Sequence, residues 1–352
     1  MEVLLTGATG FVGSALLGKL LAAGHNLTIV CRSKDKVLQL PVMQQPDNDP
    51  AENSFVHRVQ IIEADLTHLE QDQREEIFQG LKQCDVVIHL AGLAHSKADK
   101  EAYWQLNYQV SKNLIHLSKR AGIERFIYIS SVKAAIQHNS TPYSDSKLAA
   151  EEYLYQQTRD GQQITQGQPG MQGVSLRPCA IYGPGMKGNL AGWIHKTARN
   201  LMPGLPRTNT CINMIGVEDV CDAICLALVQ EHFKQSNYII SDNVPYRIND
   251  LEKAIRRGAL GKTGPVLAWP KWVFYLVARA SDLLKKVLGL DTGFGKNAYN
   301  TLFVDSYVQA KAFSEETGFT PKQNFFAMLP ELIASESKPK KNNRKAAAKV
   351  KA

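Results

Sequence analysis

The chain has 352 residues, is 44% hydrophobic and 21% charged, and carries a formal net charge of +8. This composition is ordinary for a soluble globular protein, and the length suits one large α/β domain with a smaller lobe. No stretch approaches the roughly eighteen consecutive apolar residues of a membrane-spanning helix.

The excess of positive charge lies at the carboxyl end. Residues 337–352 contain seven lysines and arginines and no acid, so the remainder carries only +1, which is +8 minus 7. We therefore expect no folded surface for nucleic acid. Residues 336–352 are predicted to form a disordered basic tail, which either keeps the protein in solution or makes weak peripheral contact with anionic lipid or RNA.

The six cysteines form no C-x-x-C pair, and several lie in apolar stretches. This pattern indicates reduced, buried thiols and argues against a disulfide framework or a zinc site. The first strand pattern begins next to Met1, which leaves no room for a secretory signal. The expected location is cytoplasmic.

The first predicted element is a strand, turn and helix. Val3–Leu5 form a short apolar run, and leucines at a helical period begin at Leu16. Between them, Gly7, Gly10 and Gly13 follow at three-residue spacing. In a dinucleotide site the first glycine permits a tight turn, the second admits a pyrophosphate, and the third lets helix and strand pack closely. A glycine-rich turn that binds nothing is the alternative.

The second predicted strand, Asn26–Cys31, ends at Arg32, and the first acid comes only at Asp35. An acid at this point would bind the ribose hydroxyls of NAD, whereas an arginine accommodates the 2′-phosphate of NADP. The sequence therefore favours NADP(H), with NAD(H) as the alternative. A merely solvated Arg32 is the remaining interpretation.

Two further strands follow a predicted surface loop at residues 41–57. Val59–Ile62 is the third strand; Asp65 and Leu66 follow it, and Asp65 can cap the strand end before a helix predicted over residues 69–81. Asp85–Leu90 is the fourth, and it leads into Ala91 and Gly92. Small residues here let a cofactor ribose approach the backbone.

His89 and His95 lie in this region without a carboxylate or thiol at ligand spacing, so no metal site is predicted. A long helix over about residues 98–120 precedes the fifth strand, Glu124–Ile129. Nearly apolar strands that alternate with helices predict an α/β fold with a doubly wound parallel sheet covered on both faces. Ligands of such a sheet bind beyond the carboxyl ends of its strands.

The fifth strand stops at Ser130 and Ser131, and after a short polar loop a helix carries Tyr143 and Lys147. The last two lie one helical turn apart and share a face. A phenol is a poor base near neutrality because its pKa is about 10, and a neighbouring cation lowers that value. Ser131 can orient a carbonyl or hydroxyl toward the phenol, and a hydride partner completes a redox site. A surface tyrosine and lysine on an amphipathic helix is the alternative.

The carboxyl half carries fewer signals. Residues 158–172 are predicted to be an exposed loop before the strand Val174–Arg177, and a helix over residues 218–231 precedes the strand Tyr238–Ile240. Residues 187–189 open a helix whose amino end can hold a phosphate. Residues 264–289 are a strongly apolar helix region with interleaved lysines and arginines, which either packs over the substrate or acts as an interfacial helix or an apolar-substrate lid.

Five motifs together resemble one family: TGATGFVG at 6–13, HLAG at 89–92, SS at 130–131, Y-x-x-x-K at 143–147 and LRPCAIYGPG at 176–185. The chain is similar to the extended short-chain dehydrogenases/reductases, in the NAD-dependent epimerase/dehydratase family, and most to its nucleotide-sugar 4-epimerase and 4-keto-reductase branch. The resemblance covers roughly residues 1–330.

The family implies a Rossmann domain over residues 1–177 and a smaller carboxyl-terminal substrate lobe over residues 178–335, of which 210–241 return to the Rossmann sheet. Residues 305–321 resemble its closing element, in which a helix ends at a glycine followed by an aromatic residue and a proline. Members often form a homodimer through the helices that match 98–120 and 143–157.

The resemblance also implies roles for single residues. Ser131, Tyr143 and Lys147 would be catalytic, Asp65 would meet the adenine, and Asn107 would support the backbone network of the site. The implied cofactor-binding residues are Gly7, Thr9, Gly10, Phe11, Val12, Gly13, Arg32, Asp65, Leu66, Ala91, Gly92, Asn107, Tyr143, Lys147, Pro178 and Ile181. The implied substrate-binding residues are Ser131, Lys133, Tyr143, Asn189 and Arg207.

One stretch departs from the family pattern. Sugar-nucleotide members usually place an arginine where this chain has Thr210–Asn213, and that arginine grips the diphosphate through two hydrogen bonds. Arg207 can substitute for it. The sequence therefore predicts an NAD(P)-dependent oxidoreductase or epimerase that acts at C4 of a UDP-sugar, as a 4-keto-reductase or 4-epimerase. A reductase of a lipid or sterol-like alcohol, resembling 3β-hydroxysteroid dehydrogenase, is the alternative, and a catalytically silent NADP-binding scaffold is the second.

Overall fold

The computed structural model describes residues 1–44, 55–94, 99–136, 140–159, 170–261, 267–290, 294–304 and 307–337. His95, the basic tail from residue 338, and most of the predicted loops at 41–57 and 158–172 therefore lie outside the described residues. The chain divides into two compact units. The first consists of Met1–Tyr182, Asn213–Val244 and Val308–Gln323, and the second of Gly183–Ile212, Pro245–Tyr307 and Asn324–Ala352.

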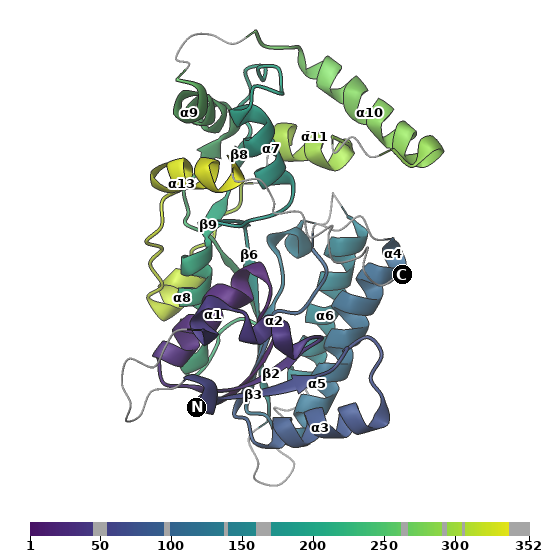
Figure 1. The fold of residues 1–352 in the computed structure, drawn as a ribbon, viewed down its shortest axis with the longest axis vertical. Coiled ribbons are helices and arrows are strands. Elements are labelled where there is room, and N and C mark those ends of the chain that lie inside the picture. The colour runs from purple at the N-terminus through teal and green to yellow at the C-terminus, as the bar shows by residue number, and fades with distance from the viewer. Residues whose placement is uncertain are drawn as a thin grey trace, which may run out of the picture. The chain divides into compact units, whose positions relative to one another are not determined.

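A seven-stranded parallel sheet forms the centre of the first unit (Figure 1). In spatial order its strands are β10 (Asn237–Ile240), β6 (Gln172–Pro178), β5 (Arg125–Ile129), β4 (Val86–His89), β1 (Glu2–Thr6), β2 (Asn26–Cys31) and β3 (Val59–Glu63). The strand order reverses between β1 and β4, which are direct neighbours. This arrangement confirms the predicted doubly wound sheet, and its switch point is where such folds bind ligands.

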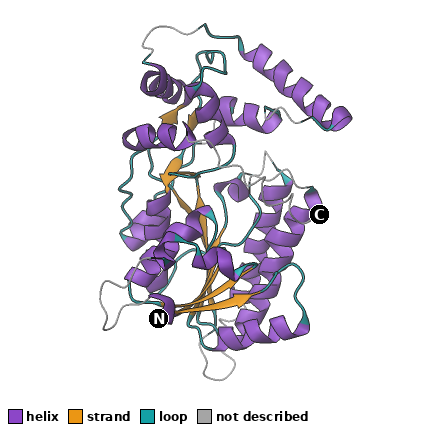
Figure 2. Ribbon diagram, in the orientation of Figure 1, coloured by secondary structure: helices purple, strands orange, loops and turns teal. Residues whose placement is uncertain are grey.

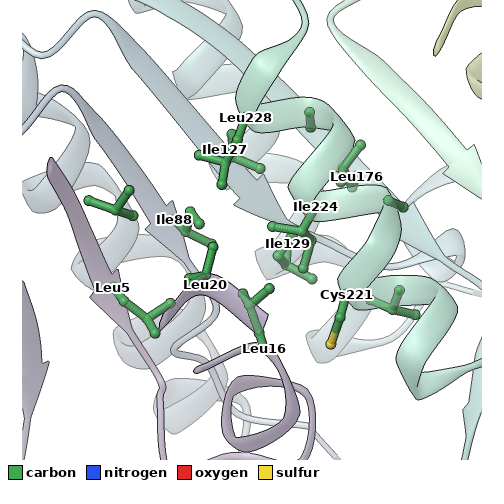
Figure 3. Close-up of a cluster of buried hydrophobic side chains, with 14 of the residues drawn as sticks. Leu5, Leu16, Leu20, Ile88, Ile127, Ile129, Leu176, Cys221, Ile224 and Leu228 are labelled. Atoms are coloured by element: carbon green, nitrogen blue, oxygen red, sulfur yellow. The ribbon is translucent and has the colours of Figure 1, made fainter. Parts of the chain in front are cut away.

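Helices α1 (Phe11–Ala22) and α8 (Val217–Val229) cover one face of the sheet. Figure 3 shows leucines of α1 and the apolar side of α8 pointing at residues of β1, β4, β5 and β6. Each fully buried leucine or isoleucine in this layer stabilises the fold by roughly 1.5–3 kcal/mol. The other face is covered by α3 (Gln71–Lys82), α5 (Val110–Ala121) and α6 (Pro142–Arg159). The strands are therefore apolar on both sides, which explains their nearly continuous hydrophobic sequences.

The prediction of one long helix over residues 98–120 is wrong in one respect. From residue 99 the chain forms α4 (Lys100–Tyr103), a π-helical turn at Trp104–Gln109, and only then α5. The wider turn changes the direction of the side chains along it, and such turns recur at functional sites. It places Asn107 in the interior, with no exposed surface.

The first unit is closed by a segment far along the chain. Helix α12 (Ala312–Thr317) ends at Gly318, whose φ is 72°, and Phe319 then enters the core beside Phe313, as predicted for the closing element. Asp219 accepts hydrogen bonds from the backbone N–H groups of Lys322 (2.8 Å) and Gln323 (2.9 Å). The remaining elements of this unit are α2 (Lys34–Leu38) and the pair β7 (Ala180–Tyr182) and β9 (Met214–Gly216).

The second unit is mainly helical (Figure 2). Helices α7 (Asn189–Ala198), α9 (Ile248–Leu260) and α13 (Phe325–Ser337) pack together, and β8 (Cys211–Ile212) pairs antiparallel with β11 (Tyr246–Arg247). On α9, the buried Arg256 bonds Glu252 and the backbone carbonyls of Met202 and Pro203, which fastens that loop to the helix. Helices α10 (Lys271–Leu288) and α11 (Lys296–Phe303) complete the unit. Of these helices, α9, α11 and α13 were not predicted.

Candidate active site

The glycine turn after β1 is closed by a hydrogen bond from Gly10 N–H to the Gly7 carbonyl (2.9 Å). Gly7 has a φ of 78°, and a β-carbon there would lie 2.7 Å from the Ala91 nitrogen. A β-carbon at Gly13 would lie 2.1 Å from the Gly7 carbonyl oxygen, so α1 rests directly on the turn. Only glycine fits these two positions.

Helix α1 begins at this turn with no side-chain cap and no acid in its first turn. Thr9 and Gly10, the N-cap residue of α1, are exposed, and Phe11 and Val12 are half-buried. The first N–H groups of a helix have no partner within the helix and carry a partial positive charge. Together they make a site that a pyrophosphate fits.

The end of β4 lies beside this turn, because Ala91 N–H donates to the hydroxyl of Thr6 on β1 (3.2 Å). At the next residue, a β-carbon on Gly92 would lie 2.9 Å from Asn107 Oδ1 and 3.1 Å from Lys147 Nζ. A larger residue would therefore press on two of the predicted site residues. Ala91 and Gly92 leave the backbone open at the switch point of the sheet.

Asn107 joins the segment after β4 to helix α6. Its Oδ1 accepts from Leu93 N–H (2.6 Å), and its Nδ2 donates to the Leu93 carbonyl (3.1 Å) and to Ser146 Oγ (3.1 Å). Ser146 Oγ in turn donates to the Tyr143 carbonyl (2.9 Å). Asn107 thus supports the backbone of the segment after β4 through its side-chain amide. Ser146, which was not singled out from the sequence, links that amide to α6. The signal for Ser146 was its place beside Lys147.

The Ser131 hydroxyl lies near the Tyr143 phenol at the carboxyl end of β5, close enough to influence the pKa of that phenol. Ser131 is buried, and its hydroxyl also accepts from the N–H of Lys133, whose own side chain is exposed. The half-buried Tyr143 ring meets Tyr103 edge to face, with ring centres 6.1 Å apart. Burial raises the pKa of Tyr143 above its ordinary value, and the nearby Ser131 hydroxyl opposes that rise.

Lys147 is buried below Tyr143 on the same helix. Its ammonium donates to the Ile129 carbonyl (2.8 Å) and lies 4.7 Å from the ring centre of Tyr128. Burial lowers the pKa of Lys147 to about 8, although the charge of Glu151 raises it. The expected lowering of the Tyr143 pKa by this lysine is not found: the ammonium is directed at the β5 backbone, and burial dominates the phenol.

His89 connects three elements beneath the site. Its two ring nitrogens pair with Thr6 Oγ1 (2.7 Å) and Ser111 Oγ (2.9 Å), and Ser111 donates to the Asn107 carbonyl (2.7 Å). Burial, together with the charge of Lys147, lowers the pKa of His89 to about 3. His89 is therefore a neutral structural residue at pH 7. Among the described residues no three His, Cys, Asp or Glu side chains gather as a metal site would require.

Arg32 and Asp65 follow β2 and β3, the two strands at the edge of the sheet. Arg32 is exposed. Asp65 accepts from the N–H (3.0 Å) and hydroxyl (2.6 Å) of Thr67, and these bonds, with a further contribution from the charge of Arg32, lower its pKa. Its neighbour Leu66 is half-buried. Asp65 therefore caps its own turn; α3 is capped instead by Glu70 and Gln73.

Pro178 ends β6 next to β5, and Ile181 lies half-buried in β7. The predicted cofactor residues Gly7–Gly13, Ala91, Gly92, Tyr143, Lys147 and Pro178 therefore lie at or beside the carboxyl ends of β1, β4, β5 and β6, in one unit.

The predicted substrate residues Asn189 and Arg207 belong to the second unit, and both are exposed. Asn189 is the first residue of α7, which follows Gly188 (φ 96°) and has no acid in its first turn. In the stretch where an arginine was expected, the Thr210 carbonyl accepts from Ile248 N–H (3.1 Å). Asn213, in the first unit, is buried and bonds Val308 N–H (2.6 Å) and Ser241 Oγ (3.1 Å). Their polar groups therefore serve the fold.

Comparison with known proteins agrees with this geometry. The model of the NAD dependent epimerase/dehydratase family matches residues 3–241. A UDP-glucose 4-epimerase of Vibrio cholerae is 27% identical over 313 residues, which cover 82% of this chain and 85% of that protein. A 3-beta-hydroxysteroid dehydrogenase of Mycolicibacterium neoaurum is 27% identical over 206 residues, covering 52% of this chain and 48% of that protein. The crystal structure of the Bordetella bronchiseptica enzyme WbmG in complex with NAD superposes with a TM-score of 0.65 at 18% identity, over 95% of this chain and 93% of that one.

Proposed function

Because the chain belongs to the NAD dependent epimerase/dehydratase family, and is an NAD(P)-dependent enzyme of the short-chain dehydrogenase/reductase type, we propose that it oxidises and reduces C4 of a UDP-linked sugar, as a 4-epimerase or 4-keto-reductase. The observation that carries the proposal is the placement of Ser131, Tyr143 and the buried Lys147 together at the carboxyl end of β5, one place from the switch point of the sheet.

The glycine turn fits a dinucleotide. A β-carbon at Gly7 or Gly13 would clash with the backbone of the turn or of the segment after β4, so the turn can stay tight. Helix α1 places an uncapped amino end beside it. The residues proposed to hold the cofactor are Gly7–Gly13 at the pyrophosphate, Arg32 and Asp65 at the adenosine, and Lys147 and Pro178–Ile181 at the nicotinamide end. When bound, the nicotinamide supplies the group that accepts or returns a hydride.

The protein's own residues then transfer the proton of the C4 hydroxyl. Tyr143 Oη exchanges the proton of the C4 hydroxyl, and Ser131 Oγ orients the C4 oxygen toward it. Lys147 is mostly charged at pH 7, since its pKa is about 8, and its ammonium at the carboxyl end of β5 is proposed to bind the nicotinamide ribose. Asn107 and Ser146 fix the helix that carries both residues.

The test of the substrate class is inhibition by uridine diphosphate. Turnover of UDP-glucose or UDP-galactose, detected as the 4-epimer or as cofactor reduction, would be inhibited competitively by UDP if the proposal is right. No turnover of a panel of UDP-sugars, together with indifference to UDP, would refute it.

One set of observations favours a second candidate, a reductase of a lipid or sterol-like alcohol. Thr210–Asn213 offer no arginine for a diphosphate, and part of the chain resembles a 3-beta-hydroxysteroid dehydrogenase. Oxidation of a 3β-hydroxysteroid that UDP does not inhibit would support this candidate over the sugar.

For the cofactor we propose NADP(H), with NAD(H) as the alternative, since the exposed residue directly after β2 is Arg32. A charge-assisted hydrogen bond to the 2′-phosphate contributes about 1.5–3 kcal/mol. Arg32→Ala should therefore weaken NADPH binding by roughly ten- to hundredfold and leave NADH binding unchanged, as measured by cofactor fluorescence. Lys34→Ala is the matched control, an exposed cation two residues further on. Equal effects of Arg32→Ala on both cofactors would favour the NAD(H) alternative.

A further inference from the structure

Helix α10 exposes an unusually large apolar surface. Only Phe274, Ala278 and Ser281 of its residues are buried. The large hydrophobic side chains that it exposes are Trp272 (63%), Tyr275 (45%), Leu276 (54%), Val277 (45%), Leu283 (62%), Leu284 (39%), Val287 (67%) and Leu288 (61%). Leu267 and Trp269 before the helix and Leu290 after it are exposed as well. Exposed apolar patches of this kind mark a surface that binds another protein, a membrane or a ligand.

Most of the exposed residues form one face. At about 100° per residue, all of those on the helix except Tyr275 lie within an apolar sector that spans roughly 160°, and Trp272, Leu276, Leu283 and Val287 occupy one half of it. The opposite side contains Lys271, Arg279, Lys285 and Lys286, with Asp282 as the helix's single acid.

The rest of the second unit packs against one narrow side of α10 and leaves its apolar face exposed. Phe274 packs against Phe303 of α11 (ring centres 5.3 Å apart), and Asp282 accepts from Lys296 N–H (3.0 Å). Trp269 N–H donates to the Gly204 carbonyl (3.0 Å), which fixes the chain before the helix. In Figure 1, α10 runs along the outside of its unit next to α11. The face is thus presented by a packed helix.

The charged residues around this face indicate what binds to it. The other side of the same helix carries four basic residues against one acid, whose carboxylate is already bonded to a backbone N–H. Residues 338–352, which follow α13 of the same unit, add seven more basic residues and no acid. An anionic lipid surface complements this arrangement, with apolar side chains entering the acyl boundary and cations remaining among the headgroups.

We propose that α10 is an interfacial helix that binds this protein reversibly to an anionic bilayer surface. The helix lies in the surface and does not cross it, in accord with the finding that none of the described helices is both long and apolar enough to span a membrane. Exposed tryptophans at its amino end, Trp269 and Trp272, suit the headgroup level.

The test is co-sedimentation of the full chain with vesicles of phosphatidylcholine alone or of an equimolar mixture with phosphatidylglycerol. We expect binding to the anionic vesicles that weakens with salt. The double variant Leu276→Gln, Leu283→Gln should reduce this binding at least ~10-fold. The matched control, Val229→Gln with Leu201→Gln, changes side chains that are 66% and 67% exposed elsewhere and should bind like the unchanged protein.

Three results would overturn the proposal. The first is vesicle binding that survives the α10 double variant but disappears from a chain ending at Ser337, because the tail alone would then be responsible. The second is equal binding to both kinds of vesicle. The third is a dimer, seen by analytical ultracentrifugation, that the α10 variant dissociates while vesicles bind neither form. Turnover of the α10 variant in solution reports separately on the active site.

Discussion

The ring of Tyr143 packs edge to face against Tyr103, and its hydroxyl lies near that of Ser131. Its pKa is raised by burial, so the phenol rests in its protonated form and can donate a proton to a developing alkoxide at C4. In the reverse direction it must lose that proton, and Lys147, whose ammonium is directed at the Ile129 carbonyl, does not lower the pKa of the phenol. The two directions of the reaction therefore place opposite requirements on the same phenol.

Tyr143→Phe removes the proton donor and keeps the ring that packs against Tyr103. We expect turnover to fall by at least ~10² with little change in thermal stability. Steady-state kinetics and a melting curve measure both. Tyr155→Phe is the control, because it makes the same change on an exposed tyrosine of α6. A Tyr143→Phe enzyme with near-normal turnover would remove the proposed acid/base.

His89 predicts a pH dependence of stability. Its pKa is about 3 in the folded chain and about 6.5 when unfolded, so between these values the unfolded state binds the extra proton. Stability linked to His89 is therefore complete above pH 6.5 and is lost as the pH falls toward 3. Between pH 7 and pH 5 the loss should be about 2 kcal/mol. Urea titrations of the unchanged protein and of His89→Gln, which cannot titrate, should differ in pH dependence by this amount. Parallel curves would contradict the assignment.

At the scale of elements, the glycine turn and the π-helical turn position the site, and only the first was predictable. The inner strands of the parallel sheet are buried on both faces and are mostly apolar, and the glycines of the turn, two of which have no room for a β-carbon, recur at regular spacing. The π-helical turn leaves no comparable pattern, since its residues also suit an ordinary helix. Ser146 was missed for the same reason, because its bond to Asn107 depends on where that turn directs the amide.

The glycine turn gives a prediction for α1. Gly13→Ala places a methyl group 2.1 Å from the Gly7 carbonyl oxygen, which must push α1 away from β1. We expect a lower melting temperature and loss of detectable dinucleotide binding. Gly192→Ala is the matched control, also inside a helix, with no atom within 4 Å of the added carbon. It should stabilise the protein by up to about 1 kcal/mol through helix propensity. Equal behaviour of the two variants would show that the turn is not tightly packed.

At the scale of the molecule, the chain alternates between its two units, and each unit is assembled from three separate segments. The strands of the first unit were predictable, but most of the second was not. Its helices α9, α11 and α13 follow no family motif, and α9 and α13 pack against each other. The exposed apolar face of α10 was ambiguous in the sequence because a buried helix and an interfacial helix have the same composition.

Phe313 tests whether the segment Val308–Gln323 is integral to the first unit. Its ring is fully buried against Tyr238 (ring centres 5.6 Å apart) and Phe319. Phe313→Ala should destabilise the protein by about 3–5 kcal/mol and expose β10 and α8 to hydrogen exchange. Phe326→Ala, at a ring that is 43% exposed, should cost much less. Unchanged exchange in β10 would show that this segment is only peripheral.

The late position of Phe313 and Phe319 also has a consequence during synthesis. The sheet can pair its strands once β10 has left the ribosome, but the side of the core that these two rings fill stays open until 79 further residues are made, counting from Ile240 to Phe319. A nascent chain of this protein therefore carries an unfinished apolar surface for several seconds at ordinary elongation rates. Trigger-factor-like chaperones that cover such surfaces should matter more for its yield than for its refolding from denaturant.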